Sequence, residues 1–127
     1  MINKLRKYNF QSLVYGKNDC NLQFLECYEP EIYEAIVGRY TTKRGGSVVA
    51  NRVCGYRSIR ELIDATPAYT KIDPRYATRD DFFIDGIHIA ICLGNKTFAY
   101  IGDESFGVVD TNIFVNDAKY TAYRKVV

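Results

Sequence analysis

The chain has 127 residues, of which 47% are hydrophobic and 14% aromatic, and this is enough apolar material for one domain spanning residues 1–127. A quarter of the residues are charged, glycine and proline are sparse, and no stretch is low in complexity, which excludes disordered, collagen-like and coiled-coil proteins. The 17 basic and 15 acidic residues leave a net charge of +2 with no long run of one sign, so we expect no binding to nucleic acid.

The N-terminal residues 1–10 mix Lys4, Arg6 and Lys7 with isolated apolar positions. They lack the continuous apolar core of a signal peptide. No segment approaches the roughly 20 apolar residues of a membrane span. We therefore expect a protein that is cytoplasmic when synthesised and has no membrane span. Residues 2–14 are expected to form a short helix or an irregular lead-in.

A turn over residues 15–18 leads into a helix that the sequence predicts over residues 20–28. Either Asn18 or Asp19 can serve as its N-cap, because the side-chain oxygen of such a residue accepts a hydrogen bond from a free amide of the first turn. Cys20 is therefore expected at the start of this helix.

The remaining sequence divides into a helical part and a strand-rich part. Further helical segments are predicted at residues 31–38, 47–53 and 59–65, with Val48, Val53 and Leu62 among their buried residues. From residue 82 onward, short runs rich in Ile, Val, Phe and Tyr alternate with Gly, Asn and Asp, a pattern typical of antiparallel strands. Strands are predicted at residues 82–84, 87–93, 97–101, 107–110 and 120–126. This order predicts an α+β fold with N-terminal helices packed on a C-terminal antiparallel β-sheet.

Four cysteines are present, at positions 20, 27, 54 and 92, and His88 is the one histidine. The cysteines are too widely spaced for paired metal-binding motifs, so we expect neither a metal site nor a cofactor. Without an export signal, the cysteines are expected to be free thiols. Cys27, Cys54 and Cys92 are expected to be core residues.

Cys20 and His88 are the two residues with the clearest potential for chemistry. A thiol at a helix start lies near free amides and the positive end of the helix dipole, which favour the thiolate. The same amides can donate to an oxyanion. A histidine is the natural base for such a thiol at neutral pH. Considered alone, however, a single cysteine and a lone histidine are more typical of packing than of catalysis.

Several segments in the same order resemble one known family. Residues 14–20 resemble the aromatic-Gly and Asp-Cys signature of NlpC-type cysteine peptidases, in which the cysteine opens a helix. Residues 77–83 resemble the segment that leads into the first strand of that family, and residues 88–94 resemble its histidine followed by an apolar strand ending in Gly. Residues 38–40 with 44–45 are similar to a compact phage-encoded branch found among tail genes.

The resemblance implies a papain-like domain in which Cys20 is the nucleophile and His88 the base of a cysteine peptidase or amidase. The implied substrate is a peptide, most plainly a peptidoglycan stem peptide. Phage tail proteins are the implied partners, and the virion is the implied final location. Tyr15 and Tyr40 are expected to line the cleft and Asp19 to position substrate, although packing and a plain N-cap explain these three residues equally well.

The chain also departs from the family pattern. Asn21 stands where active members commonly have Ser, Lys17 replaces the second Gly of the turn, and Asp80 stands where a Gly usually precedes the Asp. These departures support a second hypothesis, a papain-like structural or assembly protein of a phage virion with little or no activity.

A third polar residue orients the imidazole in this family, on the strand that follows the histidine. The spacing of the family places Tyr100 at that position. Hairpin register leaves two choices, because a two-residue loop at residues 95–96 sets His88 opposite Asp103, whereas a loop centred on Gly94 sets it opposite Tyr100. The resemblance favours Tyr100, and Asp103 is the alternative.

Overall fold

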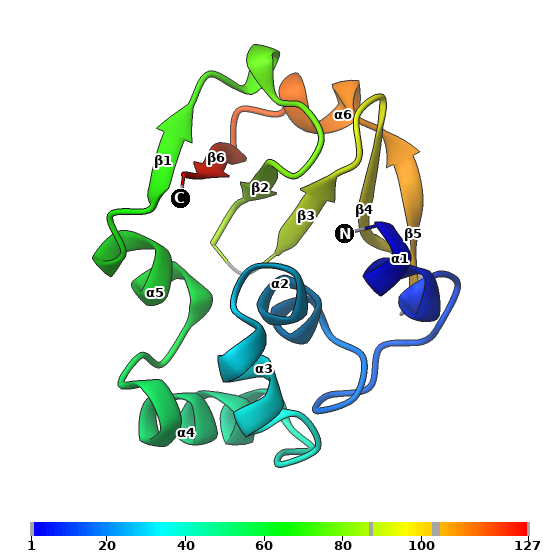
Figure 1. The fold of residues 1–127 in the computed structure, drawn as a ribbon. Coiled ribbons are helices and arrows are strands. Elements are labelled where there is room, and N and C mark those ends of the chain that lie inside the picture. The colour runs from blue at the N-terminus through cyan, green and yellow to red at the C-terminus, as the bar shows by residue number, and fades with distance from the viewer. Residues whose placement is uncertain (1, 87, 103–104, 127) are drawn as a thin grey trace.

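Helices precede an antiparallel sheet in the computed structural model, which describes residues 2–86, 88–102 and 105–126 (Figure 1). The helical part comprises α1 (Ile2–Leu5), η1 (Arg6–Tyr8), α2 (Cys20–Tyr28), α3 (Pro30–Ile36), α4 (Lys43–Cys54) and α5 (Ile59–Ala65). The second part comprises β1 (Tyr69–Ile72), η2 (Pro74–Tyr76), β2 (Phe82–Ile84), β3 (Ile89–Cys92), β4 (Lys96–Gly102), β5 (Ser105–Asp110), α6 (Asn112–Val115) and β6 (Thr121–Lys125). In the described residues the sheet has six strands in the order β1-β6-β2-β3-β4-β5. The predicted α+β class and the order of its two parts are confirmed.

Capping residues set where the helices begin. Asp19 is extended and its side chain accepts a hydrogen bond from the amide of Leu22, so α2 starts at Cys20 as predicted. Thr42 caps α4 in the same way, which starts that helix four residues earlier than its apolar pattern indicates. Ser58 caps α5, and the predicted helix over residues 59–65 is confirmed.

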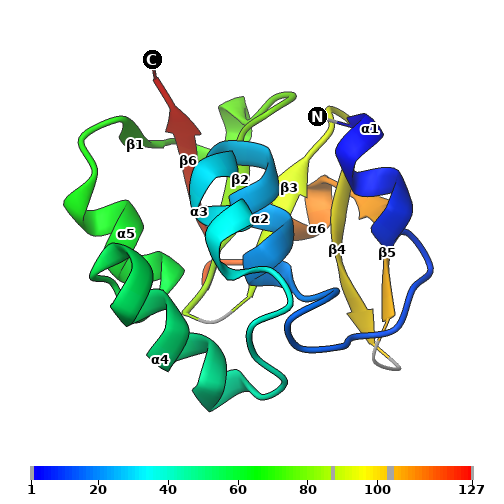
Figure 2. The ribbon, with the colours of Figure 1, turned by 60° about the horizontal axis from the view of Figure 1, so that its bottom comes forward.

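The sheet has a hydrophobic core on each face. On one face α2 packs against the central strands, and Phe24 and Phe82 are fully buried there with ring centroids 5.0 Å apart. On the other face the short helix α6 contributes Phe114, which stacks on Phe83 at 5.5 Å. Figure 2 shows α2 and α3 in front of the strands and α6 behind them. Burial on both faces explains why β2 and β3 are almost wholly apolar.

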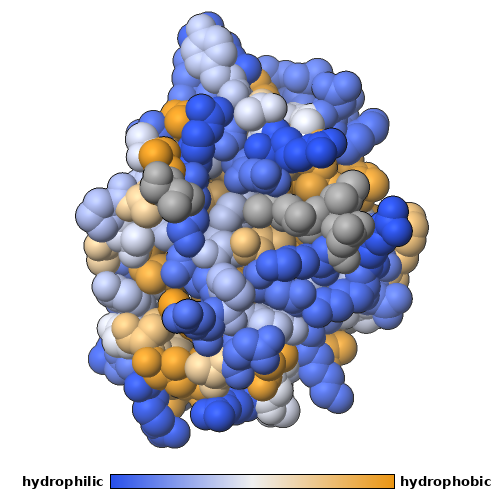
Figure 3. Space-filling model, in the orientation of Figure 1, coloured by the Kyte–Doolittle hydropathy of each residue, from blue (hydrophilic) through white to orange (hydrophobic). Residues whose placement is uncertain are grey.

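The helix α4 lies at the periphery and contains no buried residue. Val48 is 52% exposed and Val53 is 37% exposed, so the prediction that they are buried is wrong, whereas Leu62 of α5 is buried as expected. Hydrophobic atoms are visible at the lower left of Figure 3, where Figure 1 draws α4. Within the described ranges, no helix is long and apolar enough to cross a membrane.

Three of the described elements have no counterpart in the sequence prediction, namely β1, η2 and α6. β1 pairs with β6 at the edge of the described sheet, and its middle residues Thr70 and Lys71 are exposed, so it carries little apolar signal. α6 has four residues, which is too short for a helical period to be recognised in the sequence. The predicted strand over residues 87–93 is observed as Ile89–Cys92, and position 87 lies outside the described residues.

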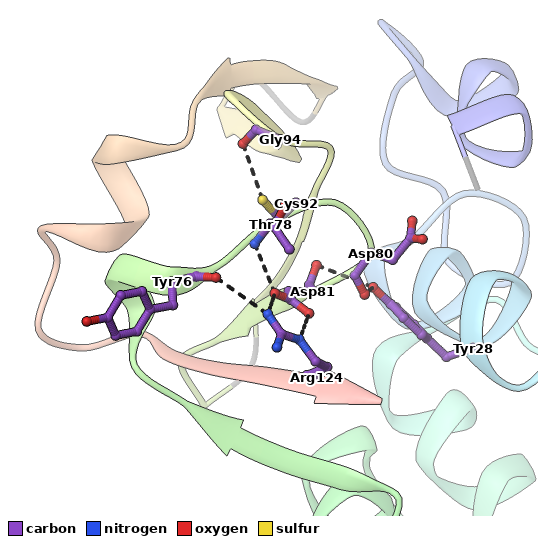
Figure 4. A network of polar contacts seen from close by, with 8 residues as sticks. All are labelled: Tyr28, Tyr76, Thr78, Asp80, Asp81, Cys92, Gly94 and Arg124. Carbon is purple, nitrogen blue, oxygen red and sulfur yellow. Dashed lines mark hydrogen bonds and ion pairs between the residues drawn. The ribbon is translucent and has the colours of Figure 1, made fainter. Parts of the chain in front are cut away.

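An ion pair between a buried carboxylate and a partly exposed arginine links the last strand to the segment before β2 (Figure 4). Arg124 of β6 donates to both carboxylate oxygens of Asp81, with Nε to Oδ1 at 2.9 Å and Nη2 to Oδ2 at 2.8 Å. The amide of Thr78 adds a third donor at 2.9 Å. Asp81 is only 1% exposed, so these donors replace the water that its carboxylate loses on folding.

The residue before this ion pair has an unusual backbone. Asp80 has a φ of 74°, in the left-handed region that glycine adopts without strain. Its carbonyl accepts a hydrogen bond from the hydroxyl of Tyr28 at 2.9 Å. The conformation explains why a glycine would be favourable at this position, where this chain has an aspartate.

Replacing Asp81 by Asn tests how much the ion pair of this buried carboxylate stabilises the fold. The amide keeps the shape of the side chain but loses the charge and places a donor near the donors of Thr78 or Arg124. We expect the free energy of unfolding to fall by about 1–3 kcal/mol in chemical denaturation. Asp73→Asn is the matched control, because it breaks the exposed pair of Asp73 with Arg75 and should cost clearly less. Equal losses in the two variants would contradict this account.

Candidate active site

A cavity of about 260 Å³ lies between the start of α2, the start of α4 and the strands β3 to β5. Five of the six predicted site residues line it, namely Cys20, His88, Tyr100, Tyr15 and Asp19. The other lining residues are Leu13, Asn21, Lys43 and Phe106. The fold therefore brings Cys20 and His88 to one cavity from distant parts of the sequence.

Cys20 is the first residue of α2 and is partly buried. Burial, followed by the charge of the neighbouring Asp19 carboxylate, raises the pKa of its thiol to about 11, although hydrogen bonds from the backbone of Ile89, Cys20 and Asn21 act in the opposite direction. The helix start was expected to favour the thiolate. Here burial and the Asp19 charge outweigh the backbone donors, so the resting thiol is protonated.

The raised pKa predicts a particular pH dependence for the alkylation of Cys20. The thiolate is the reactive form, and its fraction rises steeply with pH below the pKa of about 11 and levels off only above it. At neutral pH we expect Cys20 in the folded protein to react with iodoacetamide about 10²-fold more slowly than an ordinary thiol with a pKa of about 8.5. Mass-spectrometric labelling over a pH series measures this rate, with the denatured chain as the control. A rate already at its plateau at neutral pH would contradict the prediction.

The Asp19 carboxylate is fully engaged by the chain itself. Its Oδ1 accepts from the amide of Leu22 at 2.8 Å, and its Oδ2 accepts from the amide of Gly16 at 2.9 Å and from the hydroxyl of Tyr40 at 2.6 Å. The residue is 3% exposed. This geometry is that of an N-cap, and it leaves the carboxylate little capacity to bind a substrate.

Tyr40 contacts Asp19, the residue that precedes Cys20. It is not among the residues that line the cavity with Cys20, and its hydroxyl points to Asp19. Burial, followed by the charge of Asp19, raises its pKa. Its ring lies against Gly46 of α4, and its carbonyl lies where a Cβ on Gly16 would be, at 1.9 Å. Gly16 has a φ of +87°, so both space and backbone conformation require a glycine in this turn.

Removal of the Tyr40 hydroxyl should affect both the free energy of unfolding and the reactivity of the Cys20 thiol. We expect Tyr40→Phe to lower the free energy of unfolding by about 1–2 kcal/mol, because a buried carboxylate oxygen loses a donor. The loosened turn should expose Cys20 and speed its alkylation several-fold. Tyr69→Phe is a matched control, since Tyr69 donates to Glu29 at the same distance of 2.6 Å, remote from the cavity. An equal effect of the two variants on Cys20 alkylation would contradict the role assigned to Tyr40.

His88 lies immediately before β3 and its side chain is 48% exposed. Its Nδ1 atom is 3.2 Å from Oδ2 of Asp85, a residue that the sequence reasoning missed. The two residues face each other across the connection between β2 and β3, where the amide of Asp85 donates to the carbonyl of His88 at 3.1 Å. Gly86 lies between two apolar runs, and glycine at the first position of a two-residue loop is a recognised hairpin signal. A loop over positions 86–87 sets Asp85 opposite His88, so this signal could have revealed the neighbour.

Tyr100 approaches His88 through its ring. The two rings are nearly parallel, with an interplanar angle of 21° and centroids 6.3 Å apart. The register of β3 with β4 pairs Ile91 with Phe98, and its continuation sets His88 opposite Ile101. Both predicted registers are therefore wrong, because the turn is closed by Leu93 donating to Lys96.

Comparison with known proteins gives one family match. A family model described as a domain of unknown function, DUF6950, matches residues 2–117. The matched region includes α2, the cavity and the Asp85–His88 pair. The chain matches no curated protein and no solved structure. Asp103, the alternative partner predicted for His88, lies outside the described residues.

Proposed function

The chain belongs to the DUF6950 family of domains of unknown function, and from this premise we propose that it is a papain-like cysteine hydrolase of the NlpC type. The observation that carries the proposal is the shared cavity of Cys20 and His88. The backbone of Ile89, the residue after His88, also hydrogen-bonds to the Cys20 sulfur. A thiol and an imidazole that line one cavity support the roles of nucleophile and base that thiol hydrolysis requires.

The arrangement of elements supports the papain-like part of the proposal. Cys20 opens a helix that packs on the central strands of an antiparallel sheet, and His88 lies at the start of one of these strands. This is the order and placement that the resemblance to NlpC-type peptidases implies. The glycine-like backbone of Asp80 adds a further point of agreement, because the family usually has Gly at that position.

The proposed reaction is an acyl transfer to the thiol followed by hydrolysis. Cys20 attacks the carbonyl carbon of an amide bond while its proton passes to Nε2 of His88, because the resting thiol is protonated. The amides at the start of α2 stabilise the oxyanion. Collapse of the intermediate breaks the C–N bond, and His88 returns the proton to the leaving amine. Water, activated by His88, then cleaves the thioester and releases a carboxylic acid.

The walls of the cavity are compatible with a peptide substrate. Leu13, Tyr15 and Phe106 supply an apolar and aromatic lining beside the thiol, and Asn21 adds a polar side chain. We propose a peptide or amide bond of a peptidoglycan stem peptide as the substrate. The proposed setting is a phage tail, where such an activity would open the host envelope.

The proposal is tested by incubating purified protein with peptidoglycan and measuring newly released amino groups. We expect hydrolysis by the wild type and none by Cys20→Ala. Cys27→Ala is the matched control, because Cys27 is also partly buried with a pKa raised to about 11 but lies outside the cavity, and it should retain activity. Peptide electrophiles should label Cys20 and spare Cys27. The proposal fails if Cys20→Ala hydrolyses as well as the wild type, or if the wild type neither hydrolyses nor is labelled.

One observation favours a second candidate, a structural or assembly protein of a phage virion that keeps the fold with little activity. The thiol is protonated at rest, and the carboxylate of Asp19 opposes its ionisation. Under this alternative, particles that carry Cys20→Ala should assemble and open the host envelope as the wild type does. Normal assembly with loss of envelope opening would reject it in favour of the hydrolase.

A further inference from the structure

We propose that Asp85 is the positioning residue of His88, and that it holds the neutral imidazole with its proton on Nδ1 and a free electron pair on Nε2. The inference rests on the proposed function, since it assigns the group that prepares the base of that reaction. It departs from the expectation that this group comes from the strand after the histidine. The connection between β2 and β3 supplies this positioning group instead.

The hairpin formed by β2 and β3 makes the pair neighbours. Phe83 pairs with Ala90 and Ile84 with Ile89, so Asp85 and His88 are the next facing residues. The hydrogen bond from the amide of Asp85 to the carbonyl of His88 continues this register. Facing residues of antiparallel strands project to the same side of the sheet. The contact between the two side chains is thus a consequence of the hairpin.

The Asp85 carboxylate is fixed before it meets the imidazole. Its Oδ1 accepts from the amides of Gly86 at 2.6 Å and His88 at 2.7 Å. These bonds hold the side chain, which is 16% exposed, and leave Oδ2 directed at Nδ1 of His88 at 3.2 Å. Two amide donors stabilise the ionised carboxylate, which can only accept hydrogen bonds. Nδ1 must therefore carry the proton, and Nε2 is left as the acceptor.

Other groups lie around the imidazole without replacing this contact. The cavity beside Cys20 and a second cavity of about 200 Å³ share His88 and Tyr100 as lining residues. The titratable groups that line these two cavities with His88 are Tyr15, Asp19, Cys20, Lys43, Asp85, Tyr100, Lys119 and Tyr120. Among the described residues that line the second cavity, Asp85 alone carries a carboxylate. Burial, followed by the charge of Asp85, raises the pKa of Tyr120. The nearly parallel Tyr100 ring restricts rotation of the imidazole.

The tautomer of His88 provides a test that does not depend on activity. His88 is the one histidine of the chain, so the ring signals of ¹⁵N-histidine-labelled protein belong to this residue. At an alkaline pH where the imidazole is neutral, the two nitrogen shifts show which nitrogen carries the proton. We expect the proton on Nδ1 in the wild type. A proton on Nε2 would overturn the proposal.

Asp85→Asn is the decisive variant, because its amide oxygen can still accept from the amides of Gly86 and His88. Its NH₂ group then donates toward Nδ1, and the proton should move to Nε2, the wrong nitrogen for a base. We expect kcat to fall about 10²-fold or more with little change in KM. Tyr100→Phe should leave the tautomer unchanged, and a tautomer that switches in Tyr100→Phe but not in Asp85→Asn would overturn the assignment.

Failure of this inference can be separated from failure of the proposed function. If the wild type hydrolyses nothing, yet shows the Nδ1 tautomer and the switch in Asp85→Asn, the proposed function fails and the role of Asp85 stands. If the wild type hydrolyses peptides and Asp85→Asn retains both its rate and its tautomer, the role of Asp85 is rejected and the hydrolase stands. If Asp85→Asn does not fold, the wild-type tautomer and the Tyr100→Phe result still decide the proposal.

Discussion

The candidate site depends on one buried carboxylate, that of Asp19. It joins three parts of the chain that would otherwise be independent, namely the turn at Gly16, the loop that carries Tyr40 and the first turn of α2. The position of Cys20 follows from this junction, since the helix begins where the cap ends. Three hydrogen-bond donors stabilise the ionised form of a buried carboxylate, and the carboxylate in turn holds the donor groups in place.

The same carboxylate opposes the chemistry of the residue it positions. Its negative charge lies beside the thiol and, together with burial, disfavours the thiolate. The backbone donors near the Cys20 sulfur offset this effect only in part. A cysteine in such a setting has little thiolate at rest. Its reactivity therefore depends on how well a neighbouring base accepts the proton of the thiol. The orientation of His88 is therefore more important here than in a site with a strongly acidic thiol.

Local signals in the sequence were sufficient for some features and insufficient for others. The polar residues at positions 18–19 indicate the start of α2, and the apolar runs indicate β2 and β3, because these signals involve residues close in sequence. The partner of His88 required a hairpin register, and a shift of one residue in a turn changes which side chains meet. The role of Tyr40 depends on contacts with Asp19 and Gly46. No local pattern predicts those contacts.

The short connection between β2 and β3 has a consequence for how this family can vary. Asp85 and His88 meet because the hairpin places them face to face. One inserted or deleted residue between them would turn the histidine toward the opposite side of the sheet, whatever its identity. Loops elsewhere on the surface can change length freely. Related chains that keep this pairing should therefore tolerate substitutions in this connection more readily than changes in its length.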